Sequence, residues 1–389
     1  MKVKPLAGLV MILMFIMVLS ACGGGGDNSP STSALTPPTP AASAWAWGMN
    51  GYGQLGNGTV IGSPVPVQIS GLSAIIAVSG GEYHTLALTA DGTVWAWGDN
   101  DYGQLGDGTT TGKKTPVKVF TGAKAIAAGQ YHSLALKSDG TVWAWGHNNY
   151  GQLGDNTTTD RPLPVQVMVL KNIESVAAGF EYSMALNSSG DVFSWGFNYF
   201  GQLGDGTNVD TYIPKSIITG RIVQIACGYY SSMAMVFDGT VFIWGADYSG
   251  IPIIGREFID SLSPMLIDKF DGVKTMAGGY SHMVFLKSDG TVWTIGQNGR
   301  GQLGNGTTMN SFTPVQVSGL SGVIAIASGA FHTIALKPDG TVYTWGENTN
   351  GQLGDGTTSN RSTPEQVRNI TGGTIVGAGA YHTIALTNP

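Results

Sequence analysis

The chain repeats one sequence unit along almost its whole length, and this repetition constrains its fold more than any other feature. The tetrapeptide Gly-Gln-Leu-Gly recurs at a nearly constant interval, beginning at Gly53, Gly103, Gly151, Gly201, Gly301 and Gly351. One degenerate copy, around Gly250, fills the longer gap between Gly201 and Gly301. Each unit also carries a motif of the Trp-x-Trp-Gly type and a segment of the His-Thr-Leu-Ala-Leu type. Seven units with these landmarks indicate a repeat architecture in which each unit packs against the next.

We expect four short β-strands in one unit, at residues 65–69, 74–79, 84–89 and 93–97. Gly, Pro or Asp-Gly separates these β-rich segments, and no stretch of the repeats has helical periodicity. Asp91-Gly92 predicts a hairpin, because a type I′ turn needs positive φ at both central residues. The fold class is therefore all-β.

Side chains alternate between the two faces of a strand, so Trp95 and Trp97 share one face and Val94 and Ala96 share the other. We expect each sheet to have a bulky face and a shallow face, stacked radially on its neighbours. Four-stranded sheets arranged around an axis form a β-propeller, here with seven blades.

The two ends of the repeat region complement each other. Residues 45–48 form a lone Trp-type strand, and residues 382–386 lack the Trp-type strand that should follow them. Pairing these N- and C-terminal strands would complete one blade and remove exposed strand edges. The predicted domain is a seven-bladed β-propeller over residues 44–389.

The repeat resembles that of the regulator-of-chromosome-condensation family. The resemblance rests on three consecutive motifs, which are Gly81-Glu82-Tyr83-His84-Thr85-Leu86-Ala87-Leu88, Asp91-Gly92-Thr93-Val94-Trp95-Ala96-Trp97-Gly98 and Gly103-Gln104-Leu105-Gly106-Asp107-Gly108-Thr109. It implies the propeller fold. It implies no single function, because the family includes nucleotide exchange factors, a photoreceptor, ubiquitin-ligase modules and a secreted β-lactamase inhibitor. The photoreceptor motif Gly-Trp-Arg-His-Thr reads Gly-Glu-Tyr-His-Thr here, so photoreception is not expected.

The N-terminus predicts export and lipid anchoring. A basic start with Lys2 and Lys4 precedes an apolar run from Leu6 to Leu19 that is too short to span a bilayer. Leu19-Ser20-Ala21-Cys22 resembles the lipobox of bacterial lipoproteins. We expect residues 1–21 to be a signal peptide, Cys22 to be lipidated, and residues 22–43 to form a Gly-, Ser- and Pro-rich tether. Gly23 directly after the cysteine favours the outer membrane.

Charge argues against nucleic acid as a partner. The formal net charge is −6. Without Lys2 and Lys4 the chain keeps 25 acidic residues against 19 − 2 = 17 basic ones, a net charge of −8. The longest basic run is Lys113-Lys114, whereas nucleic-acid binding depends on clustered Lys and Arg. A monomer is expected.

Several motifs that can carry chemistry have structural interpretations here. Residues 51–56 and 299–304 fit GxGxxG, but no helix follows, so the glycines are assigned to tight turns. Five of the six histidines share one repeat position and are assigned to structural hydrogen bonds; only His147 lies elsewhere. The Asp-Gly-Thr segments fit Asx turns better than calcium loops. Cys227 is expected to be a small buried residue. No catalytic, cofactor-binding or metal-binding residue is expected.

The leading functional prediction is a binding module without enzymatic activity, with a protein or polysaccharide ligand. Loops on a rigid scaffold commonly carry recognition. The degenerate fifth unit, Gly250-Ile251-Pro252-Ile253-Ile254-Gly255, either folds its isoleucines inward or forms the apolar centre of a binding rim. The candidate rim residues are Tyr212, Tyr248, Ile251, Ile253, Phe258 and Phe312. One alternative is a hydrolase or lyase acting on a polymer in the central channel, although the repeat strands offer mainly Ala, Ile and Gly there. A second, by family analogy alone, is guanine-nucleotide exchange.

Overall fold

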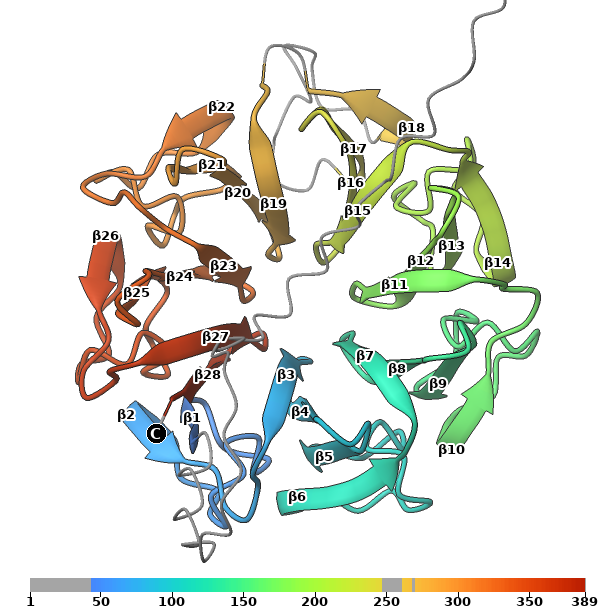
Figure 1. Ribbon diagram of the computed structural model, residues 1–389, viewed down its shortest axis with the longest axis horizontal. Helices are drawn as coiled ribbons and strands as arrows, with labels where there is room; N and C mark the ends of the chain where they lie inside the picture. Colours follow the sequence, from blue (N-terminus) through green and yellow to red (C-terminus); the bar gives the residue numbers. More distant parts are fainter. Residues whose placement is uncertain (1–42, 247–260, 268–269, 389) are drawn as a thin grey trace, which may run out of the picture. The chain divides into compact units, whose positions relative to one another are not determined.

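The computed structural model describes residues 43–246, 261–267 and 270–388. These residues form seven four-stranded antiparallel sheets arranged radially around a central axis (Figure 1). The structure thus confirms the all-β class and the seven-bladed propeller. Within the described residues there is no helix that could span a membrane.

Each blade consists of an innermost strand, two middle strands and an outermost strand. Six blades are continuous in sequence. The first is β3 (Ile75–Gly80), β4 (His84–Thr89), β5 (Val94–Gly98) and β6 (Lys113–Phe120). The second is β7 (Ala123–Ala128), β8 (His132–Lys137), β9 (Val142–Gly146) and β10 (Arg161–Gln166). The third is β11 (Ile173–Ala178), β12 (Tyr182–Asn187), β13 (Val192–Gly196) and β14 (Thr211–Ile218).

The fourth blade is β15 (Ile222–Cys227), β16 (Ser231–Val236), β17 (Val241–Gly245) and β18 (Ser261–Leu266). The fifth is β19 (Val273–Gly278), β20 (His282–Lys287), β21 (Val292–Gly296) and β22 (Ser311–Gln316). The sixth is β23 (Ala325–Ser328), β24 (His332–Leu336), β25 (Val342–Gly346) and β26 (Arg361–Gln366). The closing blade combines β27 (Gly373–Ala378) and β28 (His382–Thr387) with β1 (Ser43–Gly48) and β2 (Ser63–Gln68).

The closing blade confirms that the terminal strands pair, but it also corrects the predicted unit. β1 pairs with β28, with Ala46 opposite Ile384. The strand predicted at residues 65–69 corresponds to β2, which pairs with β1 and not with β3. The N-terminus therefore contributes two strands to the closing blade, and each sheet ends one strand later along the chain than the sequence unit suggested.

The blades pack through faces that mix large and small side chains, so the predicted division into one bulky and one shallow face was wrong. Trp97 and Ala87 pack against the closing blade, beside Ala46 and Ile384. On the other face of the same sheet, Leu86 and Ala96 are directly opposite each other across β4 and β5. This second face packs against Trp145 and Ala135 of the next blade. Large residues on one strand thus interdigitate with small ones on the neighbouring strand, as close packing requires.

Neighbouring blades are also linked by a polar relay that explains the repeated histidine. His84 Nε2 lies 3.0 Å from Ser133 Oγ of the next blade. The Ser133 hydroxyl donates to the Gln104 carbonyl at 2.8 Å, and Trp145 Nε1 donates to the same oxygen at 2.9 Å. Because the hydroxyl has only one proton, His84 must donate from Nε2. Equivalent contacts are made by His132, His282, His332 and His382. The prediction of structural hydrogen bonding is confirmed.

Two glycines of the repeat show why side chains are excluded there. A Cβ on Gly56 would lie 2.7 Å from Trp97 Nε1, and its φ is +67°. A Cβ on Gly81 would lie 2.2 Å from His84 Cε1. Because Gly56 has no side chain, the Gly-Gln-Leu-Gly turn can lie directly over the buried indole of Trp97 in the next blade. Because Gly81 has none, there is room beside it for the His84 imidazole. The assignment of the Gly-Gln-Leu-Gly motif to tight turns is confirmed.

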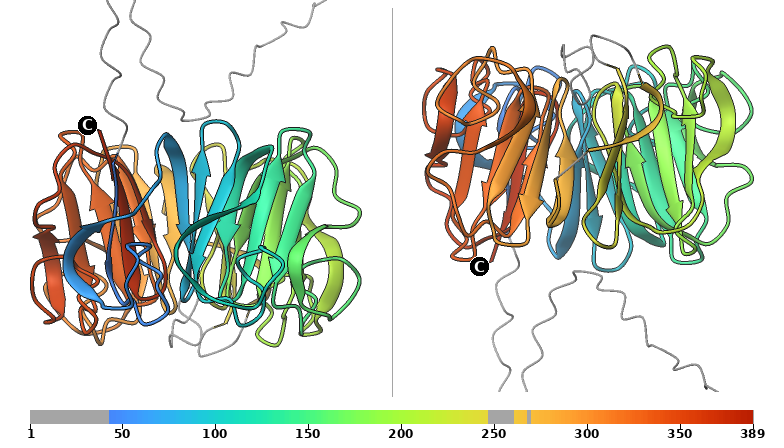
Figure 2. Two further views of the ribbon diagram at one scale, coloured as in Figure 1. Left: turned by 90° about the horizontal axis from the view of Figure 1, so that it is seen from below. Right: turned by 90° about the horizontal axis from the view of Figure 1, so that it is seen from above.

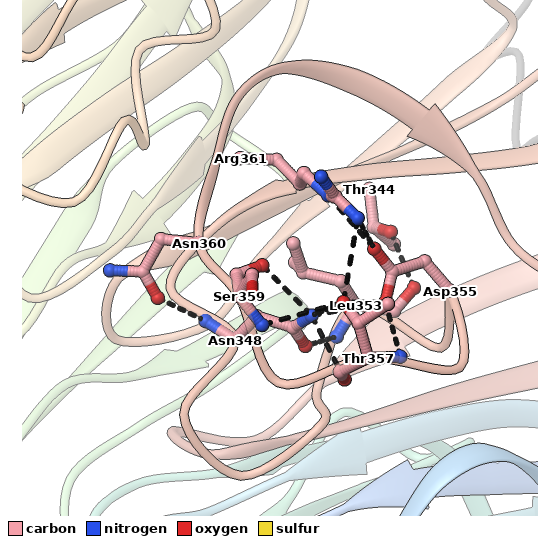
Figure 3. A network of polar contacts seen from close by, with 8 residues as sticks. All are labelled: Thr344, Asn348, Leu353, Asp355, Thr357, Ser359, Asn360 and Arg361. Carbon is pink, nitrogen blue, oxygen red and sulfur yellow. Dashed lines mark hydrogen bonds and ion pairs between the residues drawn. The ribbon is translucent and has the colours of Figure 1, made fainter.

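The long loops before the outermost strands, where the structure describes them, are each organised around one asparagine, as Figure 3 shows for Asn348. Asn348 Oδ1 accepts from the Leu353 amide at 2.9 Å, while its Nδ2 donates to the Thr357 and Ser359 carbonyls at 3.1 Å. Asp355 Oδ1 accepts from the Thr357 amide at 2.9 Å, which is an Asx turn as predicted. The same central position is occupied by Asn50, Asn100, Asn148, Asn198 and Asn298. These internal hydrogen bonds hold the loops in a fixed shape.

Candidate functional site

One face of the propeller carries both the turns between innermost and second strands and the long loops between third and outermost strands. They share a face because consecutive strands of a blade are antiparallel. The hairpins between second and third strands lie on the opposite face. Figure 2 shows the propeller from the side, with the end of β28, marked C, at this opposite face. We call the face with the long loops the loop face.

Aromatic side chains form a nearly continuous chain of contacts on the loop face, which we call the aromatic arc. Its members come from all seven blades and are Tyr52, Tyr83, Tyr102, Tyr131, His147, Tyr150, Phe197, Tyr230, Tyr280, Phe331 and Tyr381. Ring centroids of Tyr83 and Tyr381 are 5.9 Å apart, and those of Tyr102 and His147 are 4.5 Å apart. These separations are typical of favourable aromatic pairs. The rings therefore support one another and hold a preformed surface.

The arc surrounds the end of the central channel, where a cavity of about 200 Å³ is lined mainly by Gly and Ala. Gly and Ala were expected for the channel, but isoleucine, which was also expected, is not among the lining residues, and larger polar and aromatic side chains line the cavity as well, including Glu82, Gln130 and Tyr229. Tyr229 lies across the channel from Glu82 and donates its hydroxyl proton to Glu82 Oε2 at 2.9 Å. Gln130 Nε2 donates to the same carboxylate and lies 3.1 Å from the Tyr229 hydroxyl. Three blades thus meet at one buried carboxylate.

Backbone hydrogen bonds between successive blades form a closed ring around the same opening. The Glu82 amide donates to Gln130 at 3.2 Å, and the Ala380 amide closes the ring on Gly81 at 3.0 Å. The other links of the ring are made by the amides of Gln130, Phe180, Tyr229, Tyr280 and Ala330. The turns that carry the aromatic residues are consequently fixed to one another, and the arc has a rigid base.

Burial changes the titration of several groups on this face. Burial and the neighbouring Glu82 raise the pKa of Tyr83 above its ordinary range, and the same two causes act on Tyr131. Both phenols are therefore neutral hydrogen-bonding groups. His147 Nδ1 lies 3.0 Å from both carboxylate oxygens of Glu181. Burial disfavours its charged form, but the hydrogen bond and charge of Glu181 raise the pKa of His147. Among the described residues, no group of three or more His, Cys, Asp or Glu side chains could hold a metal ion.

Of the six candidate rim residues, the structure describes Tyr212 and Phe312, and these two lie apart. Tyr212 lies in β14 and Phe312 in β22, on outermost strands separated by the β15–β18 blade. They are 44% and 41% exposed, and neither belongs to the aromatic arc. Tyr212 packs closely over Gly151 of the neighbouring blade, so it has a structural role at the edge of the ring. The other four candidates, Tyr248, Ile251, Ile253 and Phe258, lie outside the described residues.

Sequence reasoning overlooked the residues of the arc because it treated the Gly-x-x-His segment as part of the frame. The two variable positions before the histidine were the available signal. They hold Glu82 and Tyr83 in the first blade, and five of the seven blades carry an aromatic residue directly before the histidine position. Cys227 lines the channel, and burial raises the pKa of its thiol to about 12, which agrees with a structural role.

A seven-bladed propeller with buried polar relays between most neighbouring blades and a preformed loop face defines a class of repeat scaffold. The family model for the RCC1-like domain matches residues 124–389. Models for the regulator of chromosome condensation (RCC1) repeat match residues 43–88, 91–136 and 75–104. The chain therefore belongs to the family of RCC1-like domains.

Individual relatives share with this chain either a short segment or the fold. The Protein RCC2 homolog of Danio rerio is 45% identical over 58 residues, which are 14% of this chain and 12% of that protein. Human WBSCR16 has 24% identity and a TM-score of 0.80, covering 90% of this chain and 99% of that one. Prp20p from Saccharomyces cerevisiae, described with its binding properties to Gsp1p and histones, has 24% identity and a TM-score of 0.81, covering 90% and 92%. At these identities the structural likeness concerns the fold alone.

Proposed function

We propose that this protein is an exported, lipid-anchored module that binds a partner protein through the aromatic arc of its loop face. The observation that carries the proposal is the arc itself, because tyrosines on a rigid base contribute large contact area at little entropic cost. Tyr52 and Tyr102 are 44% and 37% exposed, so their rings are available for contact. The proposed role is binding alone and includes no catalytic step. The module acts as a monomer.

A protein partner is favoured over a polysaccharide by the size and curvature of the surface. The arc passes through all seven blades, and a continuous face of this kind suits a folded partner. The protein-binding properties of Prp20p to Gsp1p and histones support the general use of this scaffold for protein recognition. They do not identify the partner here. Guanine-nucleotide exchange and polymer cleavage receive no specific support from the residues of the loop face.

The arc is tested by capturing partners from envelope and secreted proteins with residues 43–389 immobilised. Tyr52→Ala with Tyr102→Ala removes two exposed rings, and interface aromatics commonly contribute about 2 kcal/mol each, so capture should fall by more than about 100-fold in affinity. Phe237→Ala is the matched control, because Phe237 is 85% exposed in the β16–β17 hairpin on the opposite face. If the unmodified protein, the double tyrosine variant and the Phe237→Ala variant all captured the partner equally, the binding surface would lie elsewhere.

Anchoring is tested independently of the partner. Cys22→Ser removes the thiol that would carry the acyl group, so labelling with a fatty-acid probe should disappear and the protein should leave the membrane fraction. Replacing Ser20 with Ala keeps a small residue before the cysteine and serves as the control. A Cys22→Ser protein that is still labelled would refute the anchor.

A further inference from the structure

Apart from Glu347 in the sixth blade, the acidic side chains beside the aromatic arc lie mainly on one part of the loop face. They come from the β3–β6, β7–β10 and β11–β14 blades and are Glu82, Asp99, Asp101, Asp160 and Glu181, which we call the acidic sector. The lysine and arginine ion pairs that the structure gives for these blades join an aspartate of an outer loop to a basic residue of the outermost strand. They join Lys113 to Asp107, Arg161 to Asp155 and Lys215 to Asp205. None of these three pairs involves the acidic sector, in which Glu181 pairs with His147.

The centre of the sector presents hydrogen-bond acceptors to the channel cavity. Glu82 and Gln130 are each only 8% exposed, and both line the cavity. Within the described residues, Gln130 Oε1 has no hydrogen-bond donor. A carboxylate beside an unpaired amide oxygen favours a ligand that donates hydrogen bonds and accepts none. Ammonium and guanidinium groups are such ligands. Tyrosine faces around the opening add cation–π attraction.

The sixth blade shows how a guanidinium fits into this arrangement. Arg300 Cζ lies 4.3 Å from the centroid of the Phe331 ring, and its guanidinium forms an ion pair with Glu347. Glu347 is only 3% exposed, so a buried carboxylate, an aromatic ring and a cation are combined at the arc. The cation comes from the loop of the preceding blade.

The same three repeat positions are occupied differently at the first blade. Asp99 stands where Glu347 stands, Tyr83 stands where Phe331 stands, and Tyr52 stands where Arg300 stands. Tyr52 stacks on Tyr83 with centroids 4.8 Å apart. Asp99 is 5% exposed and accepts from Gln104 Nε2 at 2.9 Å. The carboxylate and the ring are retained, but the chain supplies a second aromatic ring in place of the cation.

We propose that the acidic sector binds a basic segment of the partner protein, whose lysine or arginine side chains pair with Asp99 and Glu82 between the tyrosine rings. This inference rests on the proposed function and adds that the segment of the partner that binds here is positively charged. The cavity of about 200 Å³ accommodates a side chain and not a folded domain, so the partner inserts one cationic side chain at the centre.

The test uses three octapeptides as probes, with alternating Lys-Gly, Ser-Gly and Glu-Gly sequences, and measures their affinity by calorimetry with residues 43–389. The Lys-Gly peptide should bind, and binding should weaken as salt increases, because the attraction between exposed charges is screened. Asp99→Asn with Glu82→Gln should weaken it by at least about tenfold, since charged interface pairs are costly to break. Glu174→Gln with Glu365→Gln removes the same charge from exposed positions in β11 and β26 and should leave the affinity unchanged.

A second variant tests the repeat comparison directly. Tyr52→Arg places a guanidinium where the sixth blade has Arg300, so it should pair with Asp99 inside the chain and weaken Lys-Gly binding more than Tyr52→Phe does. The inference is overturned if the Lys-Gly peptide binds no better than Ser-Gly, or if both charge-neutralised proteins lose affinity equally. It is also overturned if a neutral oligosaccharide such as cellohexaose binds and the Lys-Gly peptide does not. Capture lost in the tyrosine variants but retained after charge neutralisation would leave the aromatic face in place and refute only the cationic partner.

Discussion

Five imidazoles are buried between neighbouring blades, where burial lowers the pKa of each to about 3. In the unfolded chain the same groups titrate near 6.5. Between these two pH values the unfolded state binds more protons than the folded state, so the free energy of unfolding decreases as the pH falls. Each imidazole contributes at most about 1.4 kcal/mol per pH unit.

We therefore predict that the thermal midpoint of the propeller falls steeply as the pH decreases from about 6.5 toward 4. Scanning calorimetry over this range measures the effect. His132→Tyr copies Tyr182, whose hydroxyl lies 3.0 Å from Ser232 Oγ at the same repeat position. Unfolding of this variant should take up about one proton fewer, so its free energy of unfolding should decrease less steeply as the pH falls. A midpoint that is independent of pH down to 4 would contradict the buried, neutral state of the histidines.

The two tryptophans of β5 allow a matched comparison of burial. Trp97 is fully buried and donates to the Gln54 carbonyl at 2.8 Å, whereas Trp95 is half-buried on the same face. Trp97→Ala should lower the free energy of unfolding by about 3–5 kcal/mol, as expected for a large core truncation. Trp95→Ala should cost clearly less. Chemical denaturation of both variants measures the difference, and equal losses would show that the core between the blades is not centred on Trp97.

At the level of the strand, β1 closes the ring because it pairs on both sides. It lies between β28 and β2, and its Trp47 is fully buried among residues of the sixth blade and the closing blade. Removing it would expose two strand edges and open a core cluster. The long-range pairing of the N- and C-terminal strands is thus the element on which the closed ring depends.

Deleting residues 43–48 should lower the thermal midpoint by more than about 10 °C, because the loss of a buried tryptophan and a strand costs several kcal/mol. Deleting residues 23–41 should have little effect, since those residues precede the first strand. Both deletions are compared by thermal unfolding of otherwise identical proteins. Similar midpoints for the two deletions would refute the stabilising role of the closure.

The sequence was sufficient for the elements that repeat and insufficient for those that vary. Period-two alternation in β5 and the Asp91-Gly92 turn predicted the strands, because local backbone preference and burial agree there. The assignment of residues 65–69 to the wrong sheet arose because strand order depends on long-range pairing, which alternation does not encode. The arc was missed for a similar reason: Tyr83 and Tyr381 are far apart in sequence, and only the closed ring brings them together.

At the level of the whole molecule, the fold separates the residues that stabilise it from the surface proposed for binding. Seven core clusters and the polar relays lie between the blades, whereas the aromatic arc and the acidic sector lie on the loop face. The closed backbone ring at the channel fixes the turns that carry the arc. The proposed binding surface would therefore need little ordering on binding, which preserves affinity.

We propose that the loop face, and not the opposite face, contacts the partner. It is tested most directly by placing a photoreactive benzoylphenylalanine at Tyr102 or at Phe237 in the full-length protein and irradiating intact cells. Both positions already carry an exposed aromatic side chain, so each replacement is conservative. If the loop face contacts the partner, a discrete crosslinked protein adduct is expected from position 102 and none from position 237. An adduct from position 237 with none from position 102 would contradict it.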